Sequence, residues 1–226
     1  MFTPDRFHIF YNLLKNDLPE FNIKYKDKSL LMKILSKILF FNNFNEFITT
    51  IKYDVYFPSE QFVEKDPKNS IIILSHEFVH AKDAQKYNPI IFSFLYLFPQ
   101  ILFIPSLLLL FIHPLFILLS LIFLLPLPAF FRMNFETRGY IMSLYMTNEI
   151  LKELSFSSEK RKEILYRQAK SIDEKYFKGW AYYKMWPFGV LKYLNTKIDE
   201  MIVDDSSNEK FPYSEEIKKS FKKSNF

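Results

Sequence analysis

The pattern of hydrophobic and polar positions predicts helices over most of the chain and one short β segment. Apolar residues recur at helical spacing over residues 7–18, 29–41, 71–87, 133–154, 158–170 and 190–202. Residues 47–57 are instead rich in β-branched and aromatic side chains and stop at Pro58, which predicts a strand or a hairpin. We expect Ser70 to cap the helix over 71–87. The fold class predicted is therefore α+β and mostly helical, with a small sheet.

Residues 90–131 interrupt this pattern with 42 consecutive positions that contain no Asp, Glu, Lys or Arg. One membrane span needs about 20 apolar residues, so the length predicts two antiparallel halves, 90–111 and 115–131, with His113-Pro114 at the turn between them. Prolines within the halves predict kinked or partly re-entrant helices: Pro99, Pro105 and Pro126. The alternative is a hairpin buried in a soluble core or in an oligomer interface.

Composition narrows the classes of function. A chain of 226 residues fits one domain, 1–226, carrying the apolar hairpin as an insertion. With 3 Gly it has no phosphate-binding glycine loop, and without Cys it has no thiolate ligand or nucleophile. The net charge of +5 comes from scattered lysines, so no nucleic-acid partner is expected. Residues 204–226 are polar, and we expect them to form a mobile tail.

Residues 76–80, His-Glu-Phe-Val-His, carry the chemistry. Residues four apart lie on one face of a helix, so His76 and His80 can present imidazole nitrogens to one cation. Glu77 lies beside that cation, where it can take a proton from water whose pKa Zn²⁺ lowers to about 7. The same carboxyl group can pass the proton to a leaving amine. This pattern predicts a zinc-dependent endopeptidase with Glu77 as the base.

A catalytic zinc needs three protein ligands and one open position. His8 and His113 lie in the N-terminal helix and in the apolar turn, so we expect the third ligand to be a carboxylate. Glu136 is the best choice, because it lies near the start of the first helix after the apolar segment.

Two further residues could support the site. Asp83 shares a helix face with the two histidines, and we expect it to orient His80 or to fix Arg132 or Arg138; direct ligation by Asp83 is the alternative. Tyr140 follows Glu136 by one helical turn and could donate a hydrogen bond to the oxyanion, although a core tyrosine is the alternative.

A hairpin would return the two ends of the apolar segment to the same side of a membrane, as a metal site shared by His76 and Glu136 requires. The flanking residues are basic: Lys82, Lys86, Arg132 and Arg138. The positive-inside rule then predicts a membrane-associated protein with the active site on the cytoplasmic side. A virion or soluble location is the alternative.

The residues His76, Glu77, His80 and Glu136, separated by an apolar hairpin, resemble the membrane gluzincin peptidases, such as the CAAX prenyl endopeptidases and the heat-shock membrane proteases. The resemblance covers residues 71–154 and implies a zincin-like core with the hairpin between the two ligand helices. Those families have Ala-Asp after the glutamate, whereas this chain has Gly139-Tyr140. We also expect it to differ from them by lacking their additional N-terminal transmembrane helices.

The spacing from His76 to Asp83, H-E-x-x-H-x-x-D, also resembles a compact group that includes mitochondrial inner-membrane assembly peptidases and small phage-encoded metallopeptidases. This resemblance implies an edge strand, here the one ending at Phe57, that pairs with an extended peptide or protein substrate. A phage source would also suit the AT-rich codon usage implied by many Lys, Asn, Ile and Phe. The rival interpretation is a non-enzymatic membrane-interacting or virion structural protein with a vestigial or structural metal site. An adaptor role for the aromatic stretch 180–188 is a third.

Overall fold

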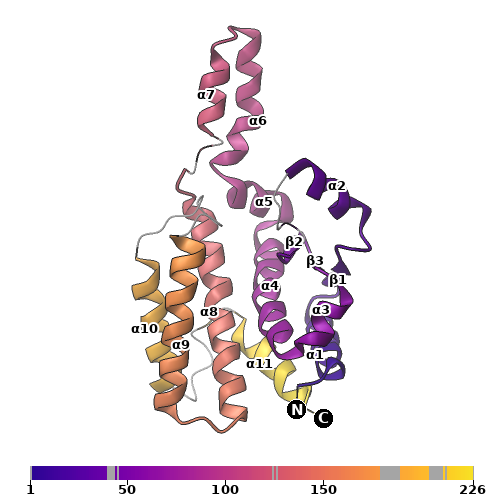
Figure 1. Ribbon diagram of the computed structural model, residues 1–226, viewed down its shortest axis with the longest axis vertical. Coiled ribbons are helices and arrows are strands. Elements are labelled where there is room, and N and C mark those ends of the chain that lie inside the picture. The colour runs from indigo at the N-terminus through magenta and orange to yellow at the C-terminus, as the bar shows by residue number, and fades with distance from the viewer. Residues whose placement is uncertain are drawn as a thin grey trace. The chain divides into compact units, whose positions relative to one another are not determined.

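The computed structural model of the protein (Figure 1) describes residues 2–39, 44, 46–123, 125, 127–178, 189–203, 211 and 213–225. The chain divides into two compact units, one formed by Met1–Lys86 with Asn208–Phe226 and the other by Tyr87–Ser207. The mostly helical α+β class is confirmed. The aromatic stretch 180–188 lies outside the described residues.

The first unit contains a three-stranded sheet with the order β1-β3-β2. Its strands are β1 (Asn22–Tyr25), β2 (Thr49–Ile51) and β3 (Asp54–Phe57). Of the two alternatives predicted for 47–57, a strand or a hairpin, the structure has the hairpin, because β2 pairs antiparallel with β3 and Thr50 lies opposite Val55. The unpredicted β1 pairs parallel with β3. The expectation that the strand ending at Phe57 is an edge strand is therefore wrong. Its last three residues are buried and it lies in the centre, which leaves β1 and β2 as the edges of the described sheet.

The described helices of this unit are α1 (Pro4–Asp17), α2 (Leu30–Leu39), α3 (Glu60–Lys65), α4 (Pro67–Tyr87) and α11 (Ser214–Lys223). Helix α4 begins earlier than predicted, since proline suits the first helical position and the Asp66 carboxylate accepts a hydrogen bond from the Asn69 amide at 3.0 Å. The prediction that Ser70 is the cap is therefore wrong, and its side chain is buried.

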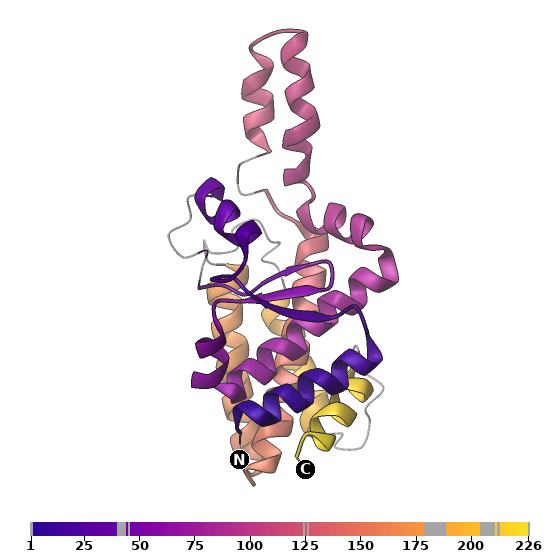
Figure 2. The same cartoon turned by 90° about the vertical axis from the view of Figure 1, so that its right-hand side faces the viewer.

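The C-terminal segment is not wholly the mobile tail that its polar composition suggested. Helix α11 packs against α1 (Figures 1 and 2) and buries Ile217 and Phe221. The Phe221 ring meets Phe10 edge-on at 6.3 Å between centroids, and the Arg6 guanidinium lies 4.6 Å from the centre of the Phe221 ring. Two apolar residues four apart make a stripe that docks this helix, although the average composition is polar.

The second unit consists of helices and helical turns. In chain order they are α5 (Pro89–Leu97), η1 (Gln100–Leu102), α6 (Phe103–Ser106), η2 (Leu107–Phe111), α7 (Phe116–Ile122), α8 (Phe130–Glu153), α9 (Ser158–Ile172), η3 (Asp173–Phe177) and α10 (Val190–Val203). Helices α8, α9 and α10 pack side by side (Figure 1) and bury apolar residues such as Leu144, Leu165 and Leu194 between them.

The predicted apolar hairpin is present, since α6 and η2 lie alongside α7 (Figure 1). Its second half is shorter than predicted: α7 ends at Ile122, and α8 begins at Phe130, after Pro128, because prolines cannot continue the helix that precedes them. Among the described helices none is by itself long and apolar enough to cross a membrane. The pair Pro89–Leu97 and Gln100–Phe111 meets that criterion only together, and it is bent by 92°.

The docking of α11 gives a stability prediction. Phe221→Ala should lower the free energy of unfolding by about 3–5 kcal/mol, because a buried aromatic ring is lost and a cavity is left. Urea titration followed by circular dichroism measures this change. Phe156→Ala, which removes an exposed ring, should change the stability by less than about 0.5 kcal/mol. Equal effects of the two substitutions would contradict the docking of α11.

Candidate metal site

Helix α4 brings the two histidines of the motif together. The Nε2 atoms of His76 and His80 lie 3.0 Å apart, and the two rings are inclined at 75°. Both side chains are buried, with 8% and 5% of their surface exposed. Two nitrogens bound to one tetrahedral zinc at 2.0–2.1 Å would be about 3.3 Å apart. The imidazoles are therefore already close to the geometry that a shared cation requires.

Glu77 follows His76 on the helix, and its carboxylate is held by the sheet. The Thr50 hydroxyl donates a hydrogen bond of 2.6 Å to Glu77 Oε2. Thr50 is the central residue of β2, so an edge strand of the described sheet lies next to the helix that carries the motif. Sequence reasoning missed Thr50, because no motif marks a threonine in a hairpin as the partner of a glutamate 27 residues away.

A buried lysine lies in the same unit. Lys26 follows β1 and is 2% exposed. Its Nζ donates to the Phe44 carbonyl oxygen at 2.7 Å and lies 4.0 Å from the centre of the Phe44 ring. Burial lowers the pKa of Lys26 to about 8, while the negative charge of Glu77 acts in the opposite direction. Lys26 is thus an electrostatic partner of Glu77 that sequence reasoning did not identify.

Glu136 lies in the second turn of α8 and is buried. The Tyr96 hydroxyl of α5 donates a hydrogen bond of 2.5 Å to Glu136 Oε1. Arg132, which we expected as one partner of Asp83, binds Tyr96 instead: its Nε donates to the Tyr96 carbonyl oxygen at 2.9 Å, and its guanidinium lies 5.0 Å from the centre of the Tyr96 ring. Tyr96 thereby fixes the orientation of the Glu136 carboxylate.

His76, His80 and Glu136 together form a group that could hold a metal ion. One nitrogen or carboxylate oxygen from each residue lies within 4.8 Å of the others, and all three side chains are buried. The three residues predicted as ligands are therefore brought together. Two imidazoles and one carboxylate form a donor set that catalytic zinc uses, with a fourth position left open.

Asp83 has a role that the sequence did not suggest. Its side chain is fully buried and accepts a hydrogen bond of 3.0 Å from the Tyr213 hydroxyl. Tyr213 immediately precedes α11 and has a positive φ of 58°. Asp83 thus connects α4 to the C-terminal segment, while its expected influence on His80 stays a prediction.

Tyr140 is part of an aromatic cluster. Its ring stacks on Tyr176 with 5.3 Å between centroids and meets Phe177 edge-on at 5.7 Å. Its contribution to oxyanion binding stays a prediction.

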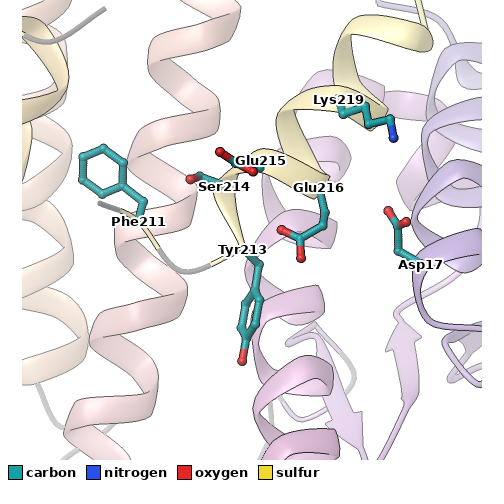
Figure 3. A pocket seen from close by; sticks show the side chains of 7 residues that line it. All are labelled: Asp17, Phe211, Tyr213, Ser214, Glu215, Glu216 and Lys219. Carbon is teal, nitrogen blue, oxygen red and sulfur yellow. The ribbon is translucent and has the colours of Figure 1, made fainter. Parts of the chain in front are cut away.

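A cavity of about 490 Å³ lies in the first unit, lined by Asp17, Phe211, Tyr213, Ser214, Glu215, Glu216 and Lys219. Figure 3 shows the carboxylates of Asp17 and Glu216 turned toward the space between their helices, with the amino group of Lys219 nearby. None of the predicted ligands lines this cavity. Tyr213 lines it and also reaches Asp83, so the cavity and α4 share one side chain.

Comparison of the chain with known protein families, with curated proteins and with solved structures finds no match. The chemistry of the site therefore rests on its residues and their geometry.

The burial of Lys26 predicts a pH dependence of stability. Its pKa is about 8 in the folded chain and about 10.4 when unfolded, so the unfolded state binds more protons between these two values. Stability should therefore rise with pH across this window. Urea midpoints at pH 7.5 and pH 10 should show this rise in the wild type relative to Lys26→Met.

The matched control is Lys65→Met, which removes an exposed lysine of α3 and should follow the wild-type pH profile. Parallel profiles for the wild type and Lys26→Met would contradict the lowered pKa of Lys26.

Proposed function

We propose that the protein is a zinc-dependent endopeptidase, with His76, His80 and Glu136 as metal ligands and Glu77 as the general base. The observation that carries the proposal is the buried group of two imidazoles and one carboxylate within 4.8 Å. Glu77 lies beside this group without belonging to it, which is the arrangement that a general base requires.

The donor set favours zinc over the other common divalent ions. Mg²⁺ and Ca²⁺ prefer six or more oxygen ligands, whereas imidazole nitrogen suits zinc and its transition-metal neighbours. A structural zinc site uses four protein ligands, and the group among the described residues has three. A three-ligand set supports a catalytic role.

In the proposed hydrolysis, Glu77 transfers the proton and Thr50 positions Glu77. Zinc, when bound, would polarise the scissile carbonyl and lower the pKa of water to about 7. Glu77 takes a proton from the attacking water, whose oxygen forms a bond to the carbonyl carbon. The carbon–nitrogen bond then breaks, and Glu77 delivers the proton to the leaving amine. The Thr50 hydroxyl donates a hydrogen bond to Glu77 Oε2 and thereby restrains the carboxylate of the proposed general base.

The position of β2 supports a peptide as the substrate. It lies at an edge of the described sheet, and Thr50 in its centre contacts Glu77. An extended peptide that added to this edge would pair its main chain with β2 and run past the general base. Substrate recognition by main-chain pairing would make the enzyme depend little on side-chain identity at most positions.

We also propose that the enzyme works at a membrane, with its site on the cytoplasmic side. The support is the uncharged segment 90–131 and the exposed apolar side chains that it carries. The same exposed hairpin favours the second candidate function, a non-enzymatic membrane-binding or virion protein in which the metal is structural. Glu77 distinguishes the two, because a structural metal site does not need it.

The ligand assignment predicts metal content. The purified wild type should contain about one zinc per chain, as expected for one site with three ligands. His80→Ala and Glu136→Ala should lose it, because each removes one of these ligands, while Glu77→Gln should retain it. Elemental analysis by mass spectrometry measures the stoichiometry, and circular dichroism verifies that each variant is folded. A folded wild type that binds no metal after incubation with zinc would overturn both the ligand set and the enzyme.

The role of Glu77 predicts a loss of hydrolysis without a loss of metal. Glu77→Gln should lower kcat for cleavage of an unstructured protein such as casein by about 10²–10⁴-fold, the usual contribution of general acid–base catalysis. Glu64→Gln, which changes an exposed glutamate of α3, is the control and should leave kcat unchanged. Zinc-loaded wild type and Glu77→Gln with equal rates would favour the structural interpretation of the metal.

A further inference from the structure

The hairpin formed by Gln100–Ile122 exposes large apolar side chains to a degree that water does not favour. Six of them expose more than 60% of their surface: Ile104, Leu108, Phe111, Ile112, Leu115 and Leu118. Phe111, next to the turn, is 90% exposed. Soluble monomers rarely expose apolar patches beyond a few hundred Å². We therefore expect another molecule or a membrane to contact this surface.

The exposure extends over more than half of the circumference of α7 instead of forming one narrow stripe, and Ser120 lies on the covered side. Ile117, Leu118 and Leu119 are consecutive and all exposed, and so are Leu121 and Ile122. Consecutive residues of a helix are about 100° apart around its axis. A protein groove would cover a single face, whereas exposure over so wide an arc favours an apolar medium around the outside of the hairpin.

The inside of the hairpin carries the opposite chemistry. Ser106 and Ser120 are buried within it. The Ser106 hydroxyl donates to the Phe103 carbonyl oxygen at 2.7 Å, and the Ser120 hydroxyl donates to the Phe116 carbonyl oxygen at 3.2 Å. Small, internally bonded residues between helices with large apolar residues outside are typical of helix pairs in lipid. The hairpin is therefore inverted relative to a water-soluble one.

The length of the hairpin limits how deeply it can enter a bilayer. Gln100–Phe111 contains 12 residues, which as a mixture of α- and 3₁₀-helix rise about 20 Å. The hydrocarbon core of a bilayer is about 30 Å thick. The turn carries Ile112 and Leu115 and has no Asp, Glu, Lys or Arg. Its one polar side chain is His113, which accepts a hydrogen bond from the Leu115 amide at 3.2 Å.

Helix α5 turns away from the hairpin by 92°. A hairpin along the bilayer normal would therefore place α5 parallel to the surface. Ile90, Ile91, Phe94 and Leu97 of α5 are exposed and recur at helical spacing, while Tyr96 binds α8. One apolar face and one bound face are typical of a helix in the membrane interface.

We propose that the hairpin Gln100–Ile122 enters a lipid bilayer from one side without crossing it, and that α5 lies in the interface at its base. The inference replaces the two spans suggested by the sequence with a monotopic insertion. It rests on the membrane association proposed above and is independent of hydrolysis.

The absence of cysteine from the chain makes a direct measurement available. A cysteine introduced by Phe111→Cys in the full-length protein is labelled with an environment-sensitive fluorophore and mixed with sealed phosphatidylcholine vesicles containing phosphatidylglycerol. Spin-labelled lipids with the nitroxide deep in the acyl chain should quench this label strongly. Glu159→Cys, at an exposed position of α9, should show no quenching. A membrane-impermeant thiol reagent trapped in the vesicle lumen should not reach the unlabelled cysteine at the tip.

A second pair of variants tests the contribution of the exposed side chains. Phe111→Glu and Leu118→Glu should each weaken vesicle partitioning at least about tenfold, since a carboxylate near the bilayer centre is strongly disfavoured. Leu154→Glu, at an exposed apolar position outside the hairpin, should have no effect. His80→Ala should bind vesicles like the wild type, which separates insertion from the metal site.

Each contrary outcome has one meaning. Modification of the tip cysteine from the lumen would show a hairpin that crosses the bilayer, so membrane association would stand and monotopic insertion would fail. A folded protein that does not bind vesicles would overturn both. If it were also a dimer by analytical ultracentrifugation, and Phe111→Glu made it monomeric, a second copy of the chain would be the cover of the hairpin.

Discussion

The need to compensate buried polar groups governs this structure. His76, His80 and Glu136 are all buried, and removing imidazoles and a carboxylate from water is costly unless they gain partners of opposite character. A cation accepted by all three would offset that cost in one step. Around them, hydroxyl groups from separate elements fulfil the same requirement: Thr50 for Glu77, Tyr96 for Glu136 and Tyr213 for Asp83. The polar site is thus supported by β2, by α5 and by the segment before α11.

The hairpin presents the opposite case, because there it is exposed apolar side chains that need a partner. The three-helix bundle buries leucines such as Leu165 and Leu194 between its helices, as water-soluble bundles do. The hairpin buries Ser106 and Ser120 and leaves Leu108 and Phe111 outside. The bundle and the hairpin therefore differ in which side chains they bury and which they expose, and this difference begins at the bend around Pro99. This contrast, more than the number of apolar residues, supports the proposed insertion into lipid.

Helix α5 contacts a buried polar group through one residue and exposes apolar side chains through others. Its Tyr96 orients the carboxylate of Glu136 and receives Arg132, while Ile90 and Phe94 of the same nine-residue helix are exposed. With Glu136 as a metal ligand and the hairpin in lipid, as proposed, α5 would connect the geometry of the site to the surroundings of the hairpin.

The sequence by itself determined the candidate metal ligands and most of the local elements. Residues 76–80 specify a helix with two imidazoles on one face, because helical periodicity is a local property, and the uncharged segment 90–131 specifies an apolar hairpin. The choice of Glu136 followed from the absence of cysteine and from chain order. Tertiary structure alone decided the rest. Thr50, Tyr96, Lys26 and Tyr213 acquire their partners through contacts between residues distant in sequence, and no periodicity encodes these. The same reason explains β1, which forms a strand only by pairing with β3, and α11, whose two apolar residues matter only where α1 receives them.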